Sequence, residues 1–243
     1  MPKARILFVT GTDTGVGKTL LTSLLLHHLR QKCCHALALK PFCSGSRKDV
    51  SLLRSLQDQE LASREINPFY FSEPVAPLVA ARKHHRPIRI ASVLEHIQNI
   101  ASRCETLLIE GAGGLLVPIA NHFTILDLIA RLHCRVVVVA RNKLGTINHT
   151  LLTVRALQHR HAFASSKIPH ASLRNLRSAF LRVVMMSHSW RDSSSDSNPR
   201  LIREFLAPVP LFTLPFLGHN CRSISAIKEN QKEFHKTLAR ILE

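Results

Sequence analysis

The chain has 243 residues, of which 45% are hydrophobic and 20% charged, so it can bury a full globular core. Its 33 Lys and Arg outnumber the 16 Asp and Glu, and the resulting net charge of +17 favours polyanions and anionic small molecules without selecting a fold. The composition excludes collagen-like, low-complexity and wholly disordered chains. We expect neither a transmembrane helix, because the apolar runs are too short, nor a signal peptide, because the start lacks an apolar region with a cleavage site.

Cysteine and histidine spacing gives no sign of a metal centre. The six cysteines include no CxxC pair, and the 15 histidines include no HExxH motif. The pattern favours free thiols in a reducing cytoplasm.

Apolar periodicity predicts alternating strands and helices. In chain order we expect a strand at 5–10, a helix at 18–32, a strand at 35–40, helices at 50–64 and 90–103, a strand at 106–110, a helix at 125–132, a strand at 135–140, a helix at 150–160, strands at 179–186 and 208–215, and a helix at 228–243. Because the strands are apolar on both faces, the prediction is an α/β fold: a single domain over 1–243 with a mostly parallel sheet and helices on both faces. Residues 161–200 are basic and rich in Ser, which suggests an atypical insertion or mobile segment.

A glycine-rich loop, GTDTGVGKT, runs from Gly11 to Thr19 between the first strand and the first helix. This arrangement is typical of P-loop NTPases, whose backbone N–H groups and helix N-terminus hold phosphates. Lys18 is expected to reach the terminal phosphates and Thr19 to ligate magnesium. The spacing departs from the usual one, because five residues separate Gly11 from Gly17. A plain glycine turn would explain the loop but not its GKT ending.

Three further segments occur in a fixed order after this loop: KPFCSG from Lys40, EGAGG from Glu110 and KLGTINH from Lys143. Together the four motifs resemble those of the dethiobiotin synthetase family. The resemblance is close over about residues 4–160 and weak over 161–243. It implies a P-loop enzyme in which 7,8-diaminononanoate takes up CO2 as a carbamate. ATP phosphorylates the carbamate, and the second amine closes the ureido ring with loss of phosphate.

The resemblance also implies roles for individual residues. It makes Lys40 and Lys18 catalytic, and we expect both side chains to face solvent in the site. It places the nucleotide on Thr14, Gly15, Val16, Gly17, Lys18, Thr19, Leu20, Asp49, Glu110, Gly111, Ala112, Gly113, Pro215, Phe216 and Leu217. It places Mg2+ on Thr19, Asp49 and Glu110, and the diamine on Thr14 and Ser44 of one subunit and on Leu144, Gly145, Thr146 and Asn148 of its partner in a homodimer.

Each residue also has a plainer interpretation. Without the motif, Lys40 could be an exposed lysine before a proline, Asp49 a helix N-cap, and Glu110 a residue at an ordinary turn. Thr146 or Asn148 could cap the helix that follows them. The chemistry favours the catalytic set, because every step builds or moves negative charge and so requires donors, lysines and a divalent cation.

One departure from the family pattern leaves the identity of the nucleotide base undecided. The family usually has an Asn after a late strand that reads adenine, whereas this chain continues Ser187-His188-Ser189. Nucleotides other than ATP are therefore possible.

Three alternative functions share some of these features. A related amidoligase is disfavoured because 243 residues leave no room for a glutamine-hydrolysing domain. A ParA- or MinD-like ATPase that binds DNA or membrane is compatible with the charge, but it would carry a second lysine where this loop has Thr12, Asp13 and Thr14. An enzyme with a drifted C-terminal half is the third. We expect a cytoplasmic homodimer that uses ATP and Mg2+, without nucleic-acid or membrane partners.

Overall fold

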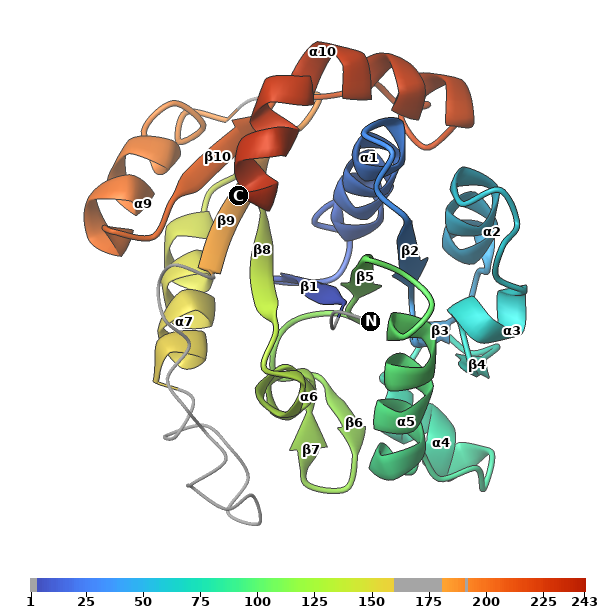
Figure 1. Cartoon of the computed structure of the whole chain (residues 1–243). Helices are drawn as coiled ribbons and strands as arrows, with labels where there is room; N and C mark the ends of the chain where they lie inside the picture. Colours follow the sequence, from blue (N-terminus) through green and yellow to red (C-terminus); the bar gives the residue numbers. More distant parts are fainter. Residues whose placement is uncertain (1–3, 160–180, 191) are drawn as a thin grey trace.

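Six strands form the central sheet of the computed structural model, which describes residues 4–159, 181–190 and 192–243 (Figure 1). The strands are β1 (Arg5–Gly11), β2 (Ala36–Leu39), β5 (Thr106–Glu110), β8 (Arg135–Arg141), β9 (Leu181–Met186) and β10 (Leu211–Leu214). Their order is β10-β9-β8-β1-β5-β2, and every neighbouring pair is parallel. The α/β class and the parallel sheet are confirmed.

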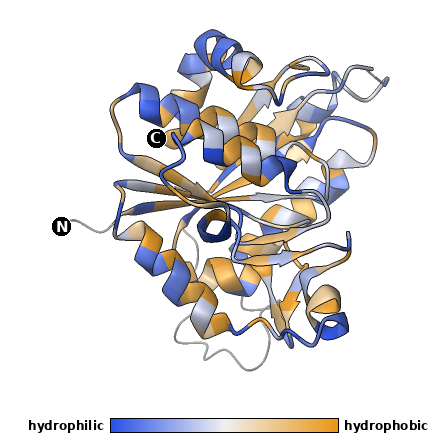
Figure 2. Ribbon diagram, turned by 90° about the vertical axis from the view of Figure 1, so that its right-hand side faces the viewer, coloured by the Kyte–Doolittle hydropathy of each residue, from blue (hydrophilic) through white to orange (hydrophobic). Residues whose placement is uncertain are grey.

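Helices cover both faces of this sheet. They are α1 (Lys18–Gln31), α5 (Ile90–Ala101), α6 (Ile125–Leu132), α7 (Thr146–Gln158), α9 (Asn198–Leu206) and α10 (Ile224–Leu242). α1 and α10 lie together on one face, whereas α5, α6 and α7 lie on the other (Figure 1). This division follows from right-handed crossovers, because the chain steps from β1 to β2 in one direction and from β5 to β10 in the other. Figure 2 shows the strands as an apolar layer between them.

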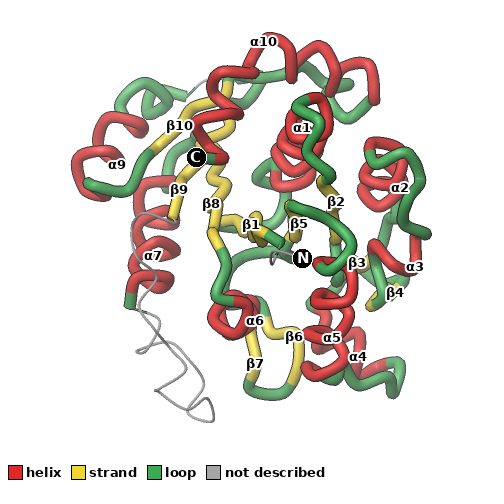
Figure 3. Tube along the Cα trace, viewed as in Figure 1, coloured by secondary structure: helices red, strands yellow, loops and turns green. Residues whose placement is uncertain are grey.

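Shorter elements flank the sheet. Strands β3 (Phe42–Ser44) and β4 (Phe69–Phe71) form a parallel pair, and β6 (Pro118–Ala120) and β7 (Phe123–Thr124) form an antiparallel one. Both pairs lie below the main sheet in Figure 3. Helix α4 (Pro77–Lys83) contacts β3 and β4, whereas α2 (Lys48–Leu56) packs against α1 and against the short helix α3 (Ser63–Ile66). The sequence pattern predicted neither the small strand pairs nor α4, because two- and three-residue strands carry too little periodicity.

Several predicted boundaries were wrong. The helix expected at 50–64 ends at Leu56, since Asp58 and Gln59 both adopt positive φ angles, which end a helix. The helices expected from 150 and from 228 begin four residues earlier, at Thr146 and Ile224. Residues 198–206 form α9, although they overlap the segment expected to be an insertion. Most of that segment, and the start of the strand expected at 179, lie outside the described residues.

Among the described residues, no helix combines the length and apolar character needed to cross a membrane.

Candidate active site

The phosphate loop connects the end of β1 to the start of α1. Gly17 is the residue before α1, and its φ of 107° is one that side chains disfavour. A Cβ on Gly17 would also lie 3.1 Å from Cγ of Met186 at the end of β9. The positive φ therefore favours glycine here, and any side chain would also require Met186 to shift. Because α1 begins at Lys18, its unpaired N–H groups are available to an anion at this loop.

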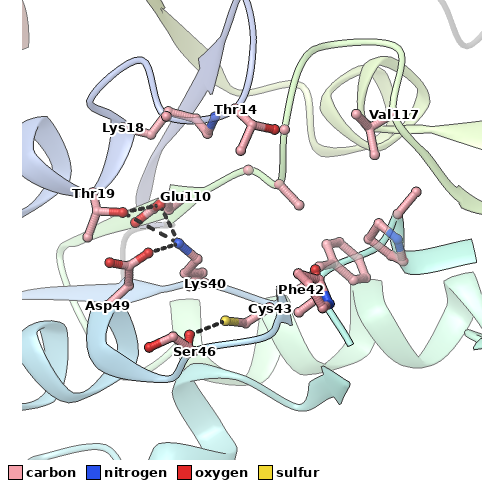
Figure 4. Close-up of a pocket in the computed structure, with 18 of the residues that line it drawn as sticks. Thr14, Lys18, Thr19, Lys40, Phe42, Cys43, Ser46, Asp49, Glu110 and Val117 are labelled. Carbon is pink, nitrogen blue, oxygen red and sulfur yellow. Dashed lines mark hydrogen bonds and ion pairs between the residues drawn. The ribbon is translucent and has the colours of Figure 1, made fainter. Parts of the chain in front are cut away.

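A cavity of about 670 Å³ opens beside this loop, at the carboxyl ends of β1, β2 and β5. Parallel α/β folds place their ligands at this edge of the sheet. Charged and hydroxyl side chains from five separate segments line the cavity: Lys18, Thr19, Lys40, Asp49, Glu110 and Arg222. Figure 4 shows that most of them point toward one another.

Lys40 lies at the centre of these groups (Figure 4). Its Nζ donates to Oδ2 of Asp49 at 2.5 Å and to Oε1 of Glu110 at 2.7 Å. The hydroxyl of Thr19 donates to the same Glu110 oxygen at 2.6 Å. The side chains of Lys40 and Glu110 are only 12% and 1% exposed, so these are buried ion pairs rather than screened surface ones. We call Thr19, Lys40, Asp49 and Glu110 the Lys40 cluster.

The sheet order explains how this cluster forms. β5 lies between β1 and β2, so Glu110 at its end is flanked by the phosphate loop on one side and by Lys40, which follows β2, on the other. Asp49 comes from the first turn of α2. Residues 9 to 91 positions apart in the chain thereby meet within hydrogen-bonding distance.

The cluster shifts the charge equilibria of its members. Burial alone would lower the pKa of Lys40, but the carboxylates of Glu110 and Asp49 outweigh it and raise that pKa above its usual value. For Asp49, burial opposes ionisation, yet the Lys40 ammonium lowers its pKa below the usual range. Burial, aided by repulsion from Lys40, lowers the pKa of Lys18 to about 8. Lys18 donates to the backbone oxygen of Asp13 at 2.7 Å.

The expectation that Lys18 and Lys40 face solvent is wrong, because Lys18 is buried and Lys40 is held between two carboxylates. The plain interpretations also fail for two residues. Lys40 is not an exposed lysine, and Asp49 is not an N-cap, since Arg47 occupies that position of α2.

The oxygen atoms of the Lys40 cluster suit a divalent cation. Oε2 of Glu110 is buried and has no hydrogen-bond partner among the described residues. A buried oxygen in that state is costly unless a ligand satisfies it. Hydroxyl and carboxylate oxygens are the ligands that Mg2+ prefers, so Thr19, Asp49 and Glu110 fit this ion.

A second, smaller hollow lies on the other side of the phosphate loop. It is lined by Thr12, Asp13, Thr14, Val16, Arg141, Lys143, Thr146 and His149. The loop 143–146 thus lies beside the phosphate loop but does not line the large cavity. Leu144 is 78% exposed, and neither Thr146 nor Asn148 caps α7, whose N-cap is Gly145.

A polar network holds this loop in place. Asp192 accepts from the backbone N–H of Leu144 at 2.8 Å. The buried amide of Asn198 donates to Oδ1 of Asn142 at 2.9 Å and to the backbone oxygen of Lys143 at 3.2 Å. Asn142 donates in turn to the backbone oxygen of Ser195 at 2.8 Å. The Ser-rich end of the basic segment therefore braces loop 143–146, which sequence reasoning did not anticipate.

The structure places the remaining predicted residues as follows. Thr14, Gly15, Gly17, Ser44, Gly111, Ala112 and Gly113 line the large cavity. Val16, which lines the smaller hollow, and Leu20 in the first turn of α1 are both buried. Pro215, Phe216 and Leu217 follow β10, outside the cavity lining.

Arg222 is a cavity residue that no motif indicated. It precedes α10 and its Nη1 lies 3.2 Å from Oδ1 of Asp49. Only the fold brings it there, because 173 positions separate the two residues.

Comparison with known proteins identifies the family. A family model described as an AAA domain matches residues 5–168. The ATP-dependent dethiobiotin synthetase BioD of Bacillus subtilis strain 168 is 40% identical over 209 residues, which cover 84% of each chain. The chain belongs to the dethiobiotin synthetase family. The BioD proteins of Bacillus velezensis and Anaeromyxobacter sp. strain K are 43% and 45% identical over 62% and 64% of this chain. These matches span 66% and 72% of the length of those relatives.

Solved structures support the fold. A chain of the MinC:MinD cell division complex of Aquifex aeolicus superposes with a TM-score of 0.54 at 11% identity, covering 98% of this chain and 96% of that one. The pNOB8 ParA bound to nonspecific DNA gives 0.53 at 11% identity, covering 98% and 96%. At such low identity these likenesses establish a shared P-loop architecture and nothing about partners.

Proposed function

We propose that this member of the dethiobiotin synthetase family closes the ureido ring of dethiobiotin from 7,8-diaminononanoate, CO2 and ATP, releasing ADP and phosphate. The observation that carries the proposal is the Lys40 cluster, a buried ammonium held by two carboxylates beside a phosphate loop. The reaction builds negative charge at each step, and fixed cationic donors in a sheltered site stabilise such charge best.

The first step forms a carbamate. One amine of the substrate attacks the carbon of CO2, a C–N bond forms, and the amine loses a proton to water. The resulting anion needs a cation within reach, and Lys40, whose raised pKa keeps it protonated, supplies one. We assign Thr14 and Ser44, which line the same cavity, to positioning of the diamine.

The second step transfers the γ-phosphoryl group. A carbamate oxygen attacks the γ-phosphorus, the bond to the bridging oxygen breaks, and ADP leaves. The backbone of residues 14–17, the start of α1 through Leu20, and residues 111–113 hold the phosphates, and Lys18 neutralises the charge that develops on them. In the third step the other amine attacks the carbamate carbon and loses a proton, the bond from that carbon to the phosphorylated oxygen breaks, and phosphate leaves as the ring closes.

We further propose that Thr19, Asp49 and Glu110 hold Mg2+, on the basis of the unpaired Glu110 oxygen. The ion would offset the phosphate charge and orient the triphosphate. Lys40 and Arg222 contact Asp49 in the described arrangement, so both cations share its carboxylate with any bound ion.

The partner subunit of a homodimer completes the site in this proposal. Leu144, Gly145, Thr146 and Asn148 would bind the substrate carboxylate of the neighbouring subunit through backbone N–H groups and the Asn amide. The exposure of Leu144 and the bracing of its loop support a role in contact with a second chain. The six free cysteines suit the cytoplasm. We assign no nucleic-acid or membrane partner, despite the charge.

Product formation tests the function. Purified protein is incubated with the diamine, bicarbonate, Mg2+ and ATP, and dethiobiotin is measured by mass spectrometry. Dethiobiotin that appears only with nucleotide would support the proposal. Its absence, together with steeply salt-dependent DNA binding, would favour instead a DNA-binding ATPase of the ParA type, which shares this fold.

A further inference from the structure

An aromatic cluster lies at the carboxyl ends of β9 and β10, and no step above uses it as a whole. It consists of His188, Trp190, Phe216 and His219. The rings of His188 and Trp190 lie 5.8 Å apart, those of His188 and Phe216 6.2 Å, and those of Phe216 and His219 5.1 Å. These centroid distances are those of interacting aromatic pairs. Segments 188–190 and 216–219, which follow different strands, thus form one continuous ring surface.

This surface is accessible rather than part of the core. Trp190 is 61% exposed and Phe216 39% exposed. The central sheet already buries its apolar side chains elsewhere, so packing does not account for a tryptophan that faces solvent. Exposed aromatic groups that gather on one surface mark a contact with a ligand or partner.

The position of the cluster relative to the phosphate loop favours a ligand. Met186, the last residue of β9, lies against Gly17, where a Cβ would approach its Cγ to 3.1 Å. His188 is two residues beyond this contact, which corresponds to at most about 7 Å of chain. The cluster therefore begins within the reach of a nucleoside whose phosphates lie on the loop.

The chemistry of the segment then indicates how such a base would be held. Ser187, His188, Ser189 and Trp190 directly follow β9, and none has a side-chain amide that could donate to and accept from a base edge at once. Ser189 is paired with Nδ1 of His188 at 3.1 Å. By contrast, every nucleobase has a π-face, and stacking on aromatic side chains is tolerant of base identity.

We infer that His188, Trp190, Phe216 and His219 form a stacking surface for the base of a nucleoside triphosphate, so that this chain accepts several bases. The inference rests on the proposed function for the position of the phosphates. Within this cluster the family resemblance assigns only Phe216 to the nucleotide, and the inference adds His188, Trp190 and His219.

The single tryptophan of the chain makes the inference directly measurable. Its fluorescence is followed while the full-length protein with Mg2+ is titrated with ATP, GTP, CTP or inorganic tripolyphosphate. We expect quenching by all three nucleotides, with dissociation constants within about tenfold of one another, since stacking tolerates base identity. Tripolyphosphate should bind without comparable quenching, because it has no base. Equal quenching by tripolyphosphate would overturn the inference, as would ATP binding more than about 100-fold tighter than GTP and CTP.

A matched pair of variants separates stacking from general effects. Phe216→Leu should weaken ATP binding about tenfold while leaving tripolyphosphate binding unchanged, in line with the loss of one base–aromatic contact. Phe205→Leu makes the same change at another exposed phenylalanine, on α9, and should alter neither affinity. Calorimetry gives both affinities without relying on fluorescence. Unchanged ATP affinity in Phe216→Leu would contradict the inference.

The titration contains no diamine, so it is independent of catalysis. If nucleotides quench Trp190 but no dethiobiotin forms, the proposed activity fails and the stacking surface stands. If dethiobiotin forms but Trp190 does not respond to any base, the activity stands and the inference is wrong.

Discussion

The two ends of the central sheet differ in the kind of side chain that they present at the same edge. At β1, β2 and β5 the chain presents buried charges fixed by ion pairs, with Glu110 only 1% exposed. At β9 and β10 it presents rings and neutral polar groups, with Trp190 61% exposed. Phosphoryl chemistry needs charges held at fixed positions, whereas holding a base needs mainly a flat surface. The need for fixed charges leaves a strict motif in the sequence, whereas the need for a flat surface does not.

The largest expected effect comes from the charged end. Lys40→Met should lower the rate of dethiobiotin formation by about 1000-fold or more, because removing a single stabilising donor already costs 100- to 1000-fold and Lys40 also orders two carboxylates. Steady-state assays by mass spectrometry measure the rate. Lys232→Ala, on the exposed surface of α10, is the control and should keep normal turnover. A Lys40→Met enzyme within tenfold of the parent would remove Lys40 from the catalytic set.

A smaller effect is expected from the network that braces loop 143–146. Asp192→Ala removes the acceptor of the Leu144 N–H and should raise KM for the diamine about tenfold, a loss of one charge-assisted hydrogen bond. KM for ATP should not change, since the loop does not line the large cavity beside the phosphate loop. Asp196→Ala, in the same Ser-rich segment, is a comparison that leaves this acceptor in place. Equal increases in both KM values would show that Asp192 supports the whole site.

Arg222 should contribute less. Its guanidinium lies 3.2 Å from Asp49 but is 55% exposed, and exposed ion pairs contribute little. Arg222→Ala is expected to change turnover by about two- to fivefold at low salt, and by less at high salt because of screening. Rate measurements at two ionic strengths check this. A loss of 100-fold would instead place Arg222 on the transferring phosphoryl group.

The smallest effect concerns pH and lies away from the site. Burial, together with the cations Lys32 and His235, lowers the pKa of His28 below its usual value of 6.5. The unfolded chain therefore takes up this proton at a higher pH than the folded one, so stability is complete above about 6.5 and falls as the pH drops below it. His28→Gln cannot titrate, and Gln can still pair with Gln231, which lies 3.1 Å from His28.

Thermal unfolding at pH 7.5 and pH 5.5 measures this difference. Between these pH values the Tm of the parent should fall about 1–2 °C further than that of His28→Gln, the scale of a fraction of a kcal/mol in a chain of this size. Parallel pH profiles would show that His28 does not contribute.

Much of the fold could be read from the sequence because its signals are local. The strand β8 (Arg135–Arg141) carries an unbroken run of five buried apolar residues, and α6 was predicted with its observed bounds. The end of α2 could not be predicted, because it depends on positive φ angles at Asp58 and Gln59, neither of which is glycine.

In the candidate site too, features within one segment could be predicted, whereas contacts between distant segments could not. The phosphate loop was evident from its glycines and Lys18, but the pairing of Lys40 with Glu110 depends on β5 lying next to β2, which is a property of the sheet. The approach of Arg222 to Asp49 and the bracing of loop 143–146 by Asp192 likewise join segments far apart in the chain. No periodicity or motif within either segment encodes such contacts.

The ammonium of Lys40 gives the protein an internal counter-ion, and this separates metal binding from folding. Two carboxylates that shared a buried site without a cation would repel each other and make the fold depend on metal. Here the Lys40 ammonium already pairs with both Asp49 and Glu110, so in the proposed magnesium site the free energy of metal binding would be coupled to nucleotide binding rather than to unfolding. A chelator should therefore abolish turnover while leaving the Tm almost unchanged, which makes it a means of trapping the folded enzyme with its substrates before reaction.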